Sequence, residues 1–317
     1  SYEVLLAESG NGFWADLLEK EAFNCLPATT TADMWAHQYV QMTNQISARK
    51  FPDDSVPFNS NSGEANMFGL EPNFGCCTAN FNQGWPKFAM SAFMRSDDGI
   101  VSAALAPASV RTTIGGQSVT CRQDTEYPFR NRLTYTVVTD APTEFELKIR
   151  IPSWAKSAYV DGKPAVPGQF FEIRRVWAGE TKVEVELEFD CKLVERPRGM
   201  KCLWRGPLLY SVAIRERWEM LEYTRAGVER KFPYCDYEVF PESDWNYGFV
   251  PGGDFAVSEQ PVGDYPFLGE QPPVEIQAQL APVDWPEEYG VAAMEPRSRK
   301  AQGEPRAVRM IPYGCAR

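Results

Sequence analysis

Histidine, long apolar runs and basic residues are all scarce in this chain of 317 residues. His37 is the only histidine. No window approaches the ~20 apolar residues that a helix needs to cross a bilayer, so no membrane partner is expected. Lys and Arg number 32 against 43 Asp and Glu, which gives a net charge of −11. Nucleic acid is excluded as a partner, because binding a polyphosphate requires clustered cations that release counterions.

Cysteine is sparse as well, with eight residues, too few for a disulfide scaffold in a chain of this length. The apolar share of 44% is sufficient for large cores. Four of the cysteines stand in apolar or strand-like runs and are predicted to be small buried hydrophobic residues. They are Cys25, Cys121, Cys191 and Cys202.

Residues 1 to about 95 show mainly helical periodicity. Apolar residues recur at helical spacing between Phe13 and Ala22, and Pro27 is predicted to end that helix. A polar stretch from Arg49 to Gly63 is typical of a long loop. A second helix is expected after Cys77, with a kink at Pro86. The apolar face predicted for it consists of Phe81, Trp85, Phe88, Ala89 and Ala92.

From Asp98 onward the period changes to two. Apolar and charged residues alternate over 144–151 and again over 182–189, which predicts antiparallel strands with one wet face. Gly115-Gly116 and Asp161-Gly162 are hairpin turn signals. We therefore predict a β-sandwich and, after it, a Pro-rich second β domain that is irregular. The predicted domains are 1–95, 96–215 and 216–317.

Cys76 and Cys77 are the most informative residues in the chain. Gly75 precedes them, and a helix is expected to begin at or just after them. A helix N-terminus favours thiolate, the form of cysteine that attacks carbon and binds zinc. Two adjacent thiolates repel each other unless a cation lies between them. Three interpretations remain open at this point: two buried inert cysteines, a vicinal disulfide, and a metal or nucleophile site.

The single histidine lies in a run of aromatic and amide residues. A lone histidine is more often structural than catalytic, but this neighbourhood suits the hydroxyls and ring face of a sugar. Glu64 and Glu71 could act as acids, although a loop carboxylate is usually only solvated. The residues predicted to line a sugar pocket are Trp35, His37, Gln38 and Tyr39, with Asn73 and Asn80 nearby.

Several runs together resemble glycoside hydrolase family 127, the β-L-arabinofuranosidase family, and they occur in order along nearly the whole chain. They are Glu21–Ala28, Asp33–Tyr39, Glu71–Asn80, Gln83–Phe88, Arg205–Tyr210 and Pro312–Cys315. The resemblance implies a catalytic (α/α)₆ barrel followed by antiparallel β-sandwich domains. This chain would then be a C-terminal fragment that contains only the last part of the barrel. The fold class expected is thus multidomain α plus β.

The resemblance also implies a retaining glycosidase that acts on a carbohydrate substrate. Cys76 matches the cysteine nucleophile of the family, and Cys77 matches a zinc ligand beside it. The other ligands, a Glu and a Cys in a Glu-x-Cys motif, are expected before Ser1, and so is the Glu that serves as acid and base. The zinc site would be incomplete without that N-terminal barrel segment, and the fragment is expected to be inactive alone.

The sequence departs from the family at one point beside the nucleophile. Thr78-Ala79-Asn80 stands where better-known members have Pro-Pro-Asn, which affects the shape of the sugar pocket. A second reading belongs to a different class: a non-catalytic carbohydrate-binding or structural β-sandwich protein with inert cysteines. Zinc content distinguishes the two. A third reading, a redox protein that switches at the cysteine pair, is tested by counting thiols with and without reductant.

Overall fold

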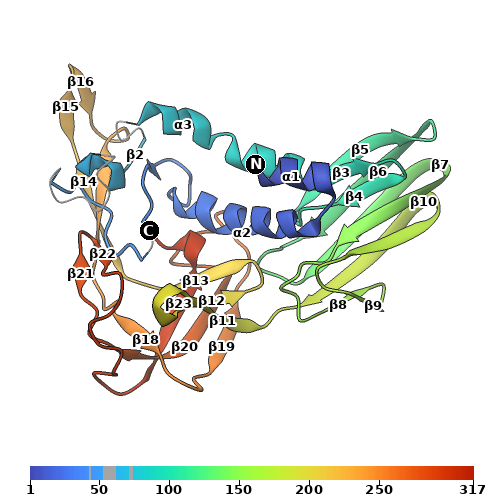
Figure 1. Ribbon diagram of the computed structural model, residues 1–317. Coiled ribbons are helices and arrows are strands. Elements are labelled where there is room, and N and C mark those ends of the chain that lie inside the picture. Colours follow the sequence, from blue (N-terminus) through green and yellow to red (C-terminus); the bar gives the residue numbers. More distant parts are fainter. Residues whose placement is uncertain (43, 53–61, 71–73) are drawn as a thin grey trace. The chain divides into compact units, whose positions relative to one another are not determined.

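The structure, a computed structural model, describes residues 1–42, 44–52, 62–70 and 74–317 (Figure 1). Strands predominate, and the α-helices of the described residues all lie before Ser91. This confirms the predicted change from helix to strand along the chain. None of the described helices is long and apolar enough to cross a membrane.

The chain divides into two compact units. The first comprises Ser1–Phe23, Gln83–Lys192 and Trp204–Leu208, and the second comprises Asn24–Asn82, Leu193–Leu203 and Leu209–Arg317. These units group residues by spatial contact. The domain boundaries at 95/96 and 215/216 remain a prediction, as does the assignment of the helices to a barrel.

Helix α2 (Gly12–Ala28) follows the short helix α1 (Tyr2–Ser9). Its buried side includes Ala15, Ala22 and Phe23, whereas Phe13 is 53% exposed. The apolar face predicted from Phe13 to Ala22 was therefore wrong at its start. Pro27 lies within the last turn, so the helix ends one residue later than predicted.

Two helices replace the single kinked helix predicted after Cys77. Helix α3 spans Gly75–Phe81 and helix α4 spans Gly84–Met90. Pro86 lies in the first turn of α4, where its missing N–H removes no helical hydrogen bond. The chain is thus interrupted before Pro86 and is not kinked there. Phe88 is buried as predicted, but Ala89 is exposed.

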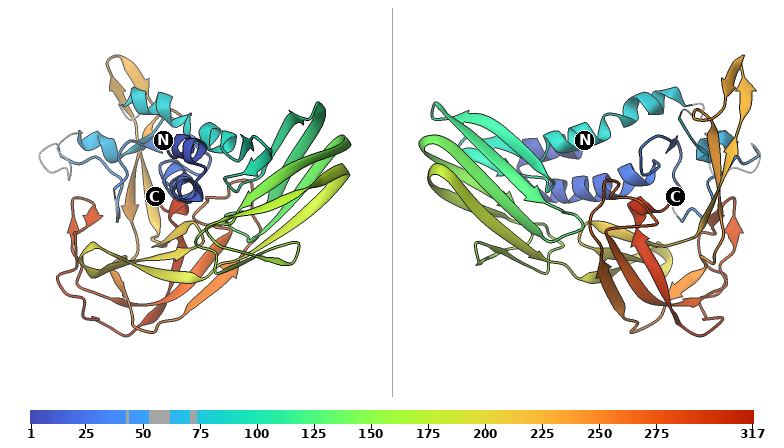
Figure 2. Two further views of the ribbon diagram at one scale, coloured as in Figure 1. Left: turned by 45° about the vertical axis from the view of Figure 1, so that its right-hand side comes forward. Right: turned by 180° about the vertical axis from the view of Figure 1, so that it is seen from behind.

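The first unit contains an eight-stranded sheet with the order β3-β4-β7-β10-β8-β9, in which β6 also pairs with β7 and β5 pairs with β6. The long strands β7 and β10 run side by side in every view (Figures 1 and 2). The strands are β3 (Phe93–Ser96), β4 (Gly99–Ser102), β5 (Ala108–Ile114), β6 (Gln117–Thr125), β7 (Arg132–Arg150), β8 (Ser157–Val160), β9 (Lys163–Ala165) and β10 (Phe170–Glu188).

The pairing along β7 explains how this sheet curls. Strand β6 pairs with Leu133–Thr139, and strand β4 pairs in parallel with Glu146–Ile149. The two halves of β7 thus have different neighbours on the same side. The register of β7 with β10 is irregular between Trp177 and Gly179, where a bulge bends paired strands. All eight strands are joined by hydrogen bonds in one curled sheet, and the sandwich remains a prediction.

The predicted alternation and turns of this sheet are confirmed. Phe145, Leu147 and Ile149 are almost completely buried. Gly115 and Gly116 connect β5 to β6, both with positive φ, as the tightest hairpin turns require. Asp161 and Gly162 connect β8 to β9 with φ angles of the same sign.

Two larger sheets and two small hairpins lie mainly in the second unit. The seven-stranded sheet has the order β11-β12-β13-β23-β20-β18, with β19 also paired to β20, and the four-stranded sheet has the order β1-β2-β17-β14. The seven strands are β11 (Cys191–Arg196), β12 (Met200–Arg205), β13 (Leu208–Val212), β18 (Tyr247–Phe249), β19 (Phe255–Glu259), β20 (Val274–Pro282) and β23 (Arg306–Pro312). The four are β1 (His37–Gln38), β2 (Phe68–Gly69), β14 (Glu216–Leu221) and β17 (Asp236–Pro241). The hairpins are β15 (Tyr223–Arg225) with β16 (Val228–Arg230), and β21 (Glu287–Glu288) with β22 (Val291–Ala292).

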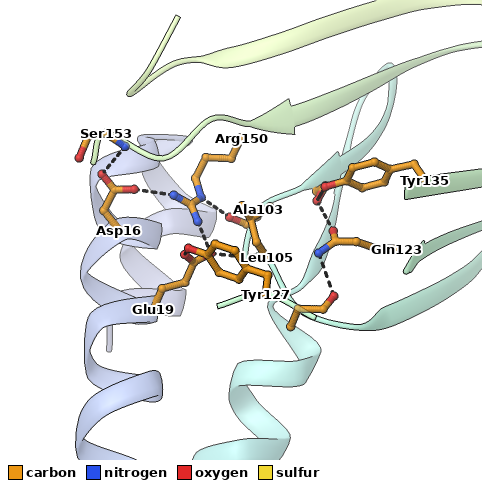
Figure 3. A network of polar contacts seen from close by, with 11 residues as sticks. Asp16, Glu19, Ala103, Leu105, Gln123, Tyr127, Tyr135, Arg150 and Ser153 are labelled. Carbon is orange, nitrogen blue, oxygen red and sulfur yellow. Dashed lines mark hydrogen bonds and ion pairs between the residues drawn. The ribbon is translucent and has the colours of Figure 1, made fainter. Parts of the chain in front are cut away.

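A buried ionic cluster connects α2 to the sheet of the first unit (Figure 3). The guanidinium of Arg150 is 1% exposed; it donates to Asp16 Oδ1 at 2.5 Å and forms an ion pair with Glu19. Glu19 also accepts hydrogen bonds from the Leu105 amide at 2.6 Å and from the Tyr127 hydroxyl at 2.5 Å. Burial raises the pKa of the Glu19 carboxyl, although Arg150 opposes that shift. Every member of the cluster therefore has a partner, which a buried charge requires.

Candidate active site

Helix α3 carries the cysteine pair in its first turn and begins at Gly75, one residue before the predicted start. Cys76 is exposed and Cys77 is half-buried. The two Sγ atoms lie 3.7 Å apart, too far for a disulfide, so the pair is present as two thiols. The expected shift toward thiolate is not observed at Cys77: burial and the neighbouring Cys76 raise the pKa of its thiol.

Of the four cysteines predicted to be buried, Cys121 is buried and Cys191 and Cys202 are half-buried. Cys25 is exposed, which corrects the prediction for that residue. Its place on α2 explains the difference, because a helix within an apolar run still has one side that faces outward.

The structure brings His37 to the helix of the cysteine pair. His37 lies on β1 and is 8% exposed. Its Nε2 atom lies 3.3 Å from the hydroxyl of Thr78, the residue after Cys77. Its ring is also nearly parallel to that of Phe81 on the same helix, with centroids 6.4 Å apart. The histidine predicted to line the pocket is therefore next to the predicted nucleophile helix.

Gln38 lies in the interior on the other face of β1, since consecutive strand residues point in opposite directions. It is 3% exposed, and its Nε2 atom donates to Gln45 Oε1 at 2.9 Å and to the Asn66 carbonyl at 2.7 Å. Gln45 donates back to Gln38 Oε1 at 3.3 Å. Both ends of the Gln38 amide are thus engaged with the protein.

Two aromatic residues predicted for the pocket have ring partners. Tyr39 is half-buried and stacks on Phe74 with centroids 3.9 Å apart. Trp35 is 44% exposed, its Nε1 donates to the Pro233 carbonyl at 2.9 Å, and its ring lies 6.2 Å from that of Tyr234. Both rings are fixed in place by these contacts.

The polar residues predicted for the site have different environments. Asn80 donates from Nδ2 to the Cys76 carbonyl at 2.8 Å, so it braces the first turn of α3. Asn73 and Glu71 lie outside the described residues. Burial alone would raise the pKa of Glu64, but hydrogen bonds from Arg225 and Lys50 outweigh it and lower that pKa. Glu64 is thus held as a carboxylate and is a poor proton donor.

A buried carboxylate on β17 was not predicted. Asp236 is 0% exposed and accepts a hydrogen bond at Oδ2 from the Tyr223 hydroxyl at 2.5 Å. Burial raises the pKa of Asp236, and burial together with Asp236 raises the pKa of Tyr223 to about 12. The sequence carries no periodic signal for this pair, because Tyr223 and Asp236 lie on different strands, β15 and β17, and meet only in the folded chain.

The cysteine pair has no third metal-binding side chain beside it among the described residues. Within 1–42, 44–52, 62–70 and 74–317, no group of three or more His, Cys, Asp or Glu side chains could hold a metal ion. A four-ligand zinc site would therefore need two ligands from elsewhere.

Comparison with known proteins points to one family. The family model described as beta-L-arabinofuranosidase, GH127 middle domain, matches residues 100–189. A non-reducing end beta-L-arabinofuranosidase of Bifidobacterium longum subsp. longum is 28% identical over 326 aligned residues, 95% of this chain. These matches support membership of glycoside hydrolase family 127.

Solved structures of family 127 have the same fold as this chain. The Geobacillus stearothermophilus T6 family 127 β-L-arabinofuranosidase, Ara127N-Se, matches 98% of it with a TM-score of 0.60 at 18% identity. The family 127 β-arabinofuranosidase BT3674 matches 99% of it with a TM-score of 0.57 at 15% identity. The chain spans 43% of the length of the Bifidobacterium relative and 45% of each of these two solved chains.

Proposed function

We propose that this chain is part of a retaining glycoside hydrolase that acts on β-L-arabinofuranosides, with Cys76 as the nucleophile. The observation that carries the proposal is the pair of unbonded sulfur atoms 3.7 Å apart on α3, in a chain of glycoside hydrolase family 127. Cys76 is the exposed member, as a nucleophile must be to reach a substrate.

The donor set fits zinc. Two sulfurs that each lie about 2.3 Å from a tetrahedral zinc ion are about 3.8 Å apart, close to the separation of Cys76 and Cys77. Cys76 and Cys77 would hold the metal together with the Glu-x-Cys ligands that family resemblance places upstream of Ser1. When bound, zinc supplies the positive charge that keeps both sulfurs ionised despite the raised pKa of Cys77.

The reaction uses Cys76 twice. Its thiolate attacks the anomeric carbon and forms a C–S bond while the glycosidic C–O bond breaks, and an upstream carboxylic acid protonates the departing oxygen. The resulting carboxylate then takes a proton from water, which attacks the same carbon and releases Cys76 as thiolate. Two inversions give net retention. His37, Trp35 and Tyr39 are proposed to contact the sugar, with Asn73 and Asn80 nearby; Gln38 would have to give up interior hydrogen bonds to do so.

We propose that the resemblance to family 127 also holds for the domain organisation. Residues 1–95, with α1 to α4, would be the last part of an (α/α)₆ barrel. The β domains that follow it in the sequence would be 96–215 and 216–317. Because the described residues supply neither two further zinc ligands nor an assigned acid, the chain alone is proposed to be inactive.

The nucleophile is tested by Cys76→Ala in a form extended upstream of Ser1. We expect release of L-arabinose from an aryl β-L-arabinofuranoside to fall by more than about 1,000-fold, because the variant lacks the sulfur that forms the covalent intermediate. Cys25→Ala, which removes an exposed thiol on α2, is the matched control and should keep activity within about twofold. Unchanged hydrolysis in Cys76→Ala would exclude the thiolate mechanism.

A further inference from the structure

Two aromatic rings meet at one end of the four-stranded sheet. Strands β1 and β17 both pair antiparallel with β2, so they run in the same direction, and His37 and Asp236 are each directly opposite Gly69. Trp35 stands two residues before His37. Tyr234 stands two residues before Asp236, so both rings come from the end of the sheet where β1 and β17 begin. The ring centroids are 6.2 Å apart, and the ring planes are tilted by 42°.

Hydrogen bonds fix the position of the Trp35 ring. In the loop before it, Asp33 Oδ1 accepts from the Trp35 amide at 3.1 Å and from the Thr31 hydroxyl at 2.6 Å. The indole Nε1 donates to the Pro233 carbonyl at 2.9 Å, which joins this loop to the segment that carries Tyr234. The ring pair is therefore organised before a ligand binds, and binding has little ordering to offset.

Both rings remain accessible in spite of these contacts. Trp35 is 44% exposed and Tyr234 is 52% exposed, whereas the residues that follow them, Ala36 and Cys235, are 2% and 1% exposed. Each ring thus points outward from a buried stretch of chain. Because the indole N–H already has its acceptor, Trp35 offers a ligand mainly the face of its ring. Rigid, exposed aromatic residues of this kind are typical of binding surfaces.

The charged groups beside the ring pair have partners of their own. Asp33 is engaged in the loop, and Glu222 Oε1 accepts from the Phe232 amide at 3.0 Å. Lys231 Nζ lies 2.6 Å from Glu229 Oε2. A neutral ligand therefore suits this surface better than a charged one. A sugar is neutral, and its C–H faces pack on aromatic rings while its hydroxyls stay in water.

We propose that Trp35 and Tyr234 form a second sugar subsite, which holds the sugar on the leaving-group side of the bond that Cys76 attacks. The Trp35 Cα lies no more than about 7 Å from that of His37, two residues along the chain. His37 in turn lies beside Thr78 on the helix of the cysteine pair. A sugar bound at His37 thus places its neighbour within reach of the ring pair. The inference rests on the proposed function and adds to it Tyr234 and an oligosaccharide as the substrate class.

Two glycosides that differ in their leaving group test this subsite in the extended form: methyl β-L-arabinofuranoside and a β-L-arabinofuranosyl disaccharide. Tyr234→Ala removes one ring, so the ratio of kcat/KM for the disaccharide to kcat/KM for the methyl glycoside should fall about 5- to 10-fold. Tyr234→Phe keeps the ring and should keep the ratio. Tyr159→Ala is the matched control, because it removes a tyrosine of similar exposure, 43%, from β8.

Binding to the extended form of Cys76→Ala gives a readout without turnover. The disaccharide should shift the NMR signal of the Trp35 indole N–H, which is assigned by its loss in Trp35→Phe. The methyl glycoside, which has no second sugar, should shift it less. If Tyr234→Ala does not fold, or if the extended form cleaves neither glycoside, this signal decides.

An unchanged ratio in folded Tyr234→Ala would overturn the inference, and so would an unmoved Trp35 signal. If the segment upstream of Ser1 covers the rings, Tyr234→Ala will lower the unfolding temperature of the extended form and leave the ratio unchanged, which also overturns it. Hydrolysis by Cys76→Ala together with a lowered ratio in Tyr234→Ala would reject the nucleophile and keep this inference. Loss of hydrolysis in Cys76→Ala with an unchanged ratio would keep the proposed function alone.

Discussion

Arg150 lies between two buried carboxylates, and its single positive charge is shared by Asp16 and Glu19. Its Nε atom also donates to the Ala103 carbonyl at 2.6 Å. Asp16 accepts a second, longer hydrogen bond from the Ser153 amide at 3.3 Å. These bonds tie a helix to segments more than 80 residues away in the sequence. Loss of the cation would leave two carboxylates buried without compensation.

Arg150→Met is expected to lower the free energy of unfolding of the first unit by about 3–5 kcal/mol at neutral pH. Burial already raises the pKa of Glu19 while Arg150 holds it down, so removal of Arg150 raises it further. A carboxyl whose pKa is higher in the folded than in the unfolded state binds its proton more tightly when folded. The variant therefore regains stability as the pH falls from 7 toward 5, and its deficit relative to the unsubstituted chain shrinks.

Urea unfolding at pH 7 and at pH 5 measures this difference. Arg174→Met is the matched control, because its ion pairs with Asp98 and Glu144 are exposed and long, at 3.7 Å each. It should change stability by no more than about 0.5 kcal/mol at either pH. An equal deficit for Arg150→Met at both pH values would contradict the expected protonation of Glu19.

Strands and hairpins are the elements that the sequence predicted best, because their sequence signals come from residues close together in the chain. The alternation around Phe145 and the glycine pair at Gly115 depend only on neighbouring residues and on backbone geometry. The buried side of α2 was harder, since Asp16 and Glu19 are interior only because Arg150 reaches them from 131 residues or more along the chain. The cysteine pair was visible as a motif. Asp236 was not, because its row with His37 is created by strand register.

Gly116→Ala is expected to destabilise the β5–β6 hairpin by about 1 kcal/mol, because φ at this position is +78° and an L side chain is strained there. No atom lies within 4 Å of the added Cβ, so the cost is one of backbone conformation alone. Gly263→Ala has equal space without a positive φ and should be neutral or slightly stabilising. Urea midpoints of the two variants provide the comparison; equal midpoints would show that the turn tolerates a side chain.

The whole chain corresponds to less than half the length of the Bifidobacterium relative, and the described residues contain no group of three or more side chains that could hold a metal ion. The two sulfurs lie on α3, and the ring of His37 lies next to this helix on β1 of the same unit. The catalytic acid and the remaining zinc ligands are placed upstream by resemblance alone. The resemblance predicted the family because its motifs are spread along the chain, whereas substrate contacts depend on the exact placement of side chains, which a motif does not give.

Zinc content should therefore distinguish the chain from a longer form. We expect well under one zinc per chain and no release of L-arabinose from the 317 residues alone. A form extended upstream should hold about one zinc and hydrolyse the aryl substrate. Cys77→Ser in the extended form should lower the zinc content, and Cys202→Ser, on β12, should not. An extended form that binds no zinc and cleaves nothing would favour a binding or structural protein.

The irregular pairing of β7 with β10 has a consequence for how the family can vary in length. Between the pairs Trp177↔Thr143 and Gly179↔Thr139, one residue of β10 faces three residues of β7. Elsewhere in these strands, an insertion of one residue would turn every following side chain to the opposite face. At this position the pairing already accommodates unpaired residues. The alternation of inward and outward side chains is therefore set separately in the two halves of the sheet. Insertions and deletions among relatives are expected to accumulate here, because a change in strand length at this position does not move buried side chains to the exposed face.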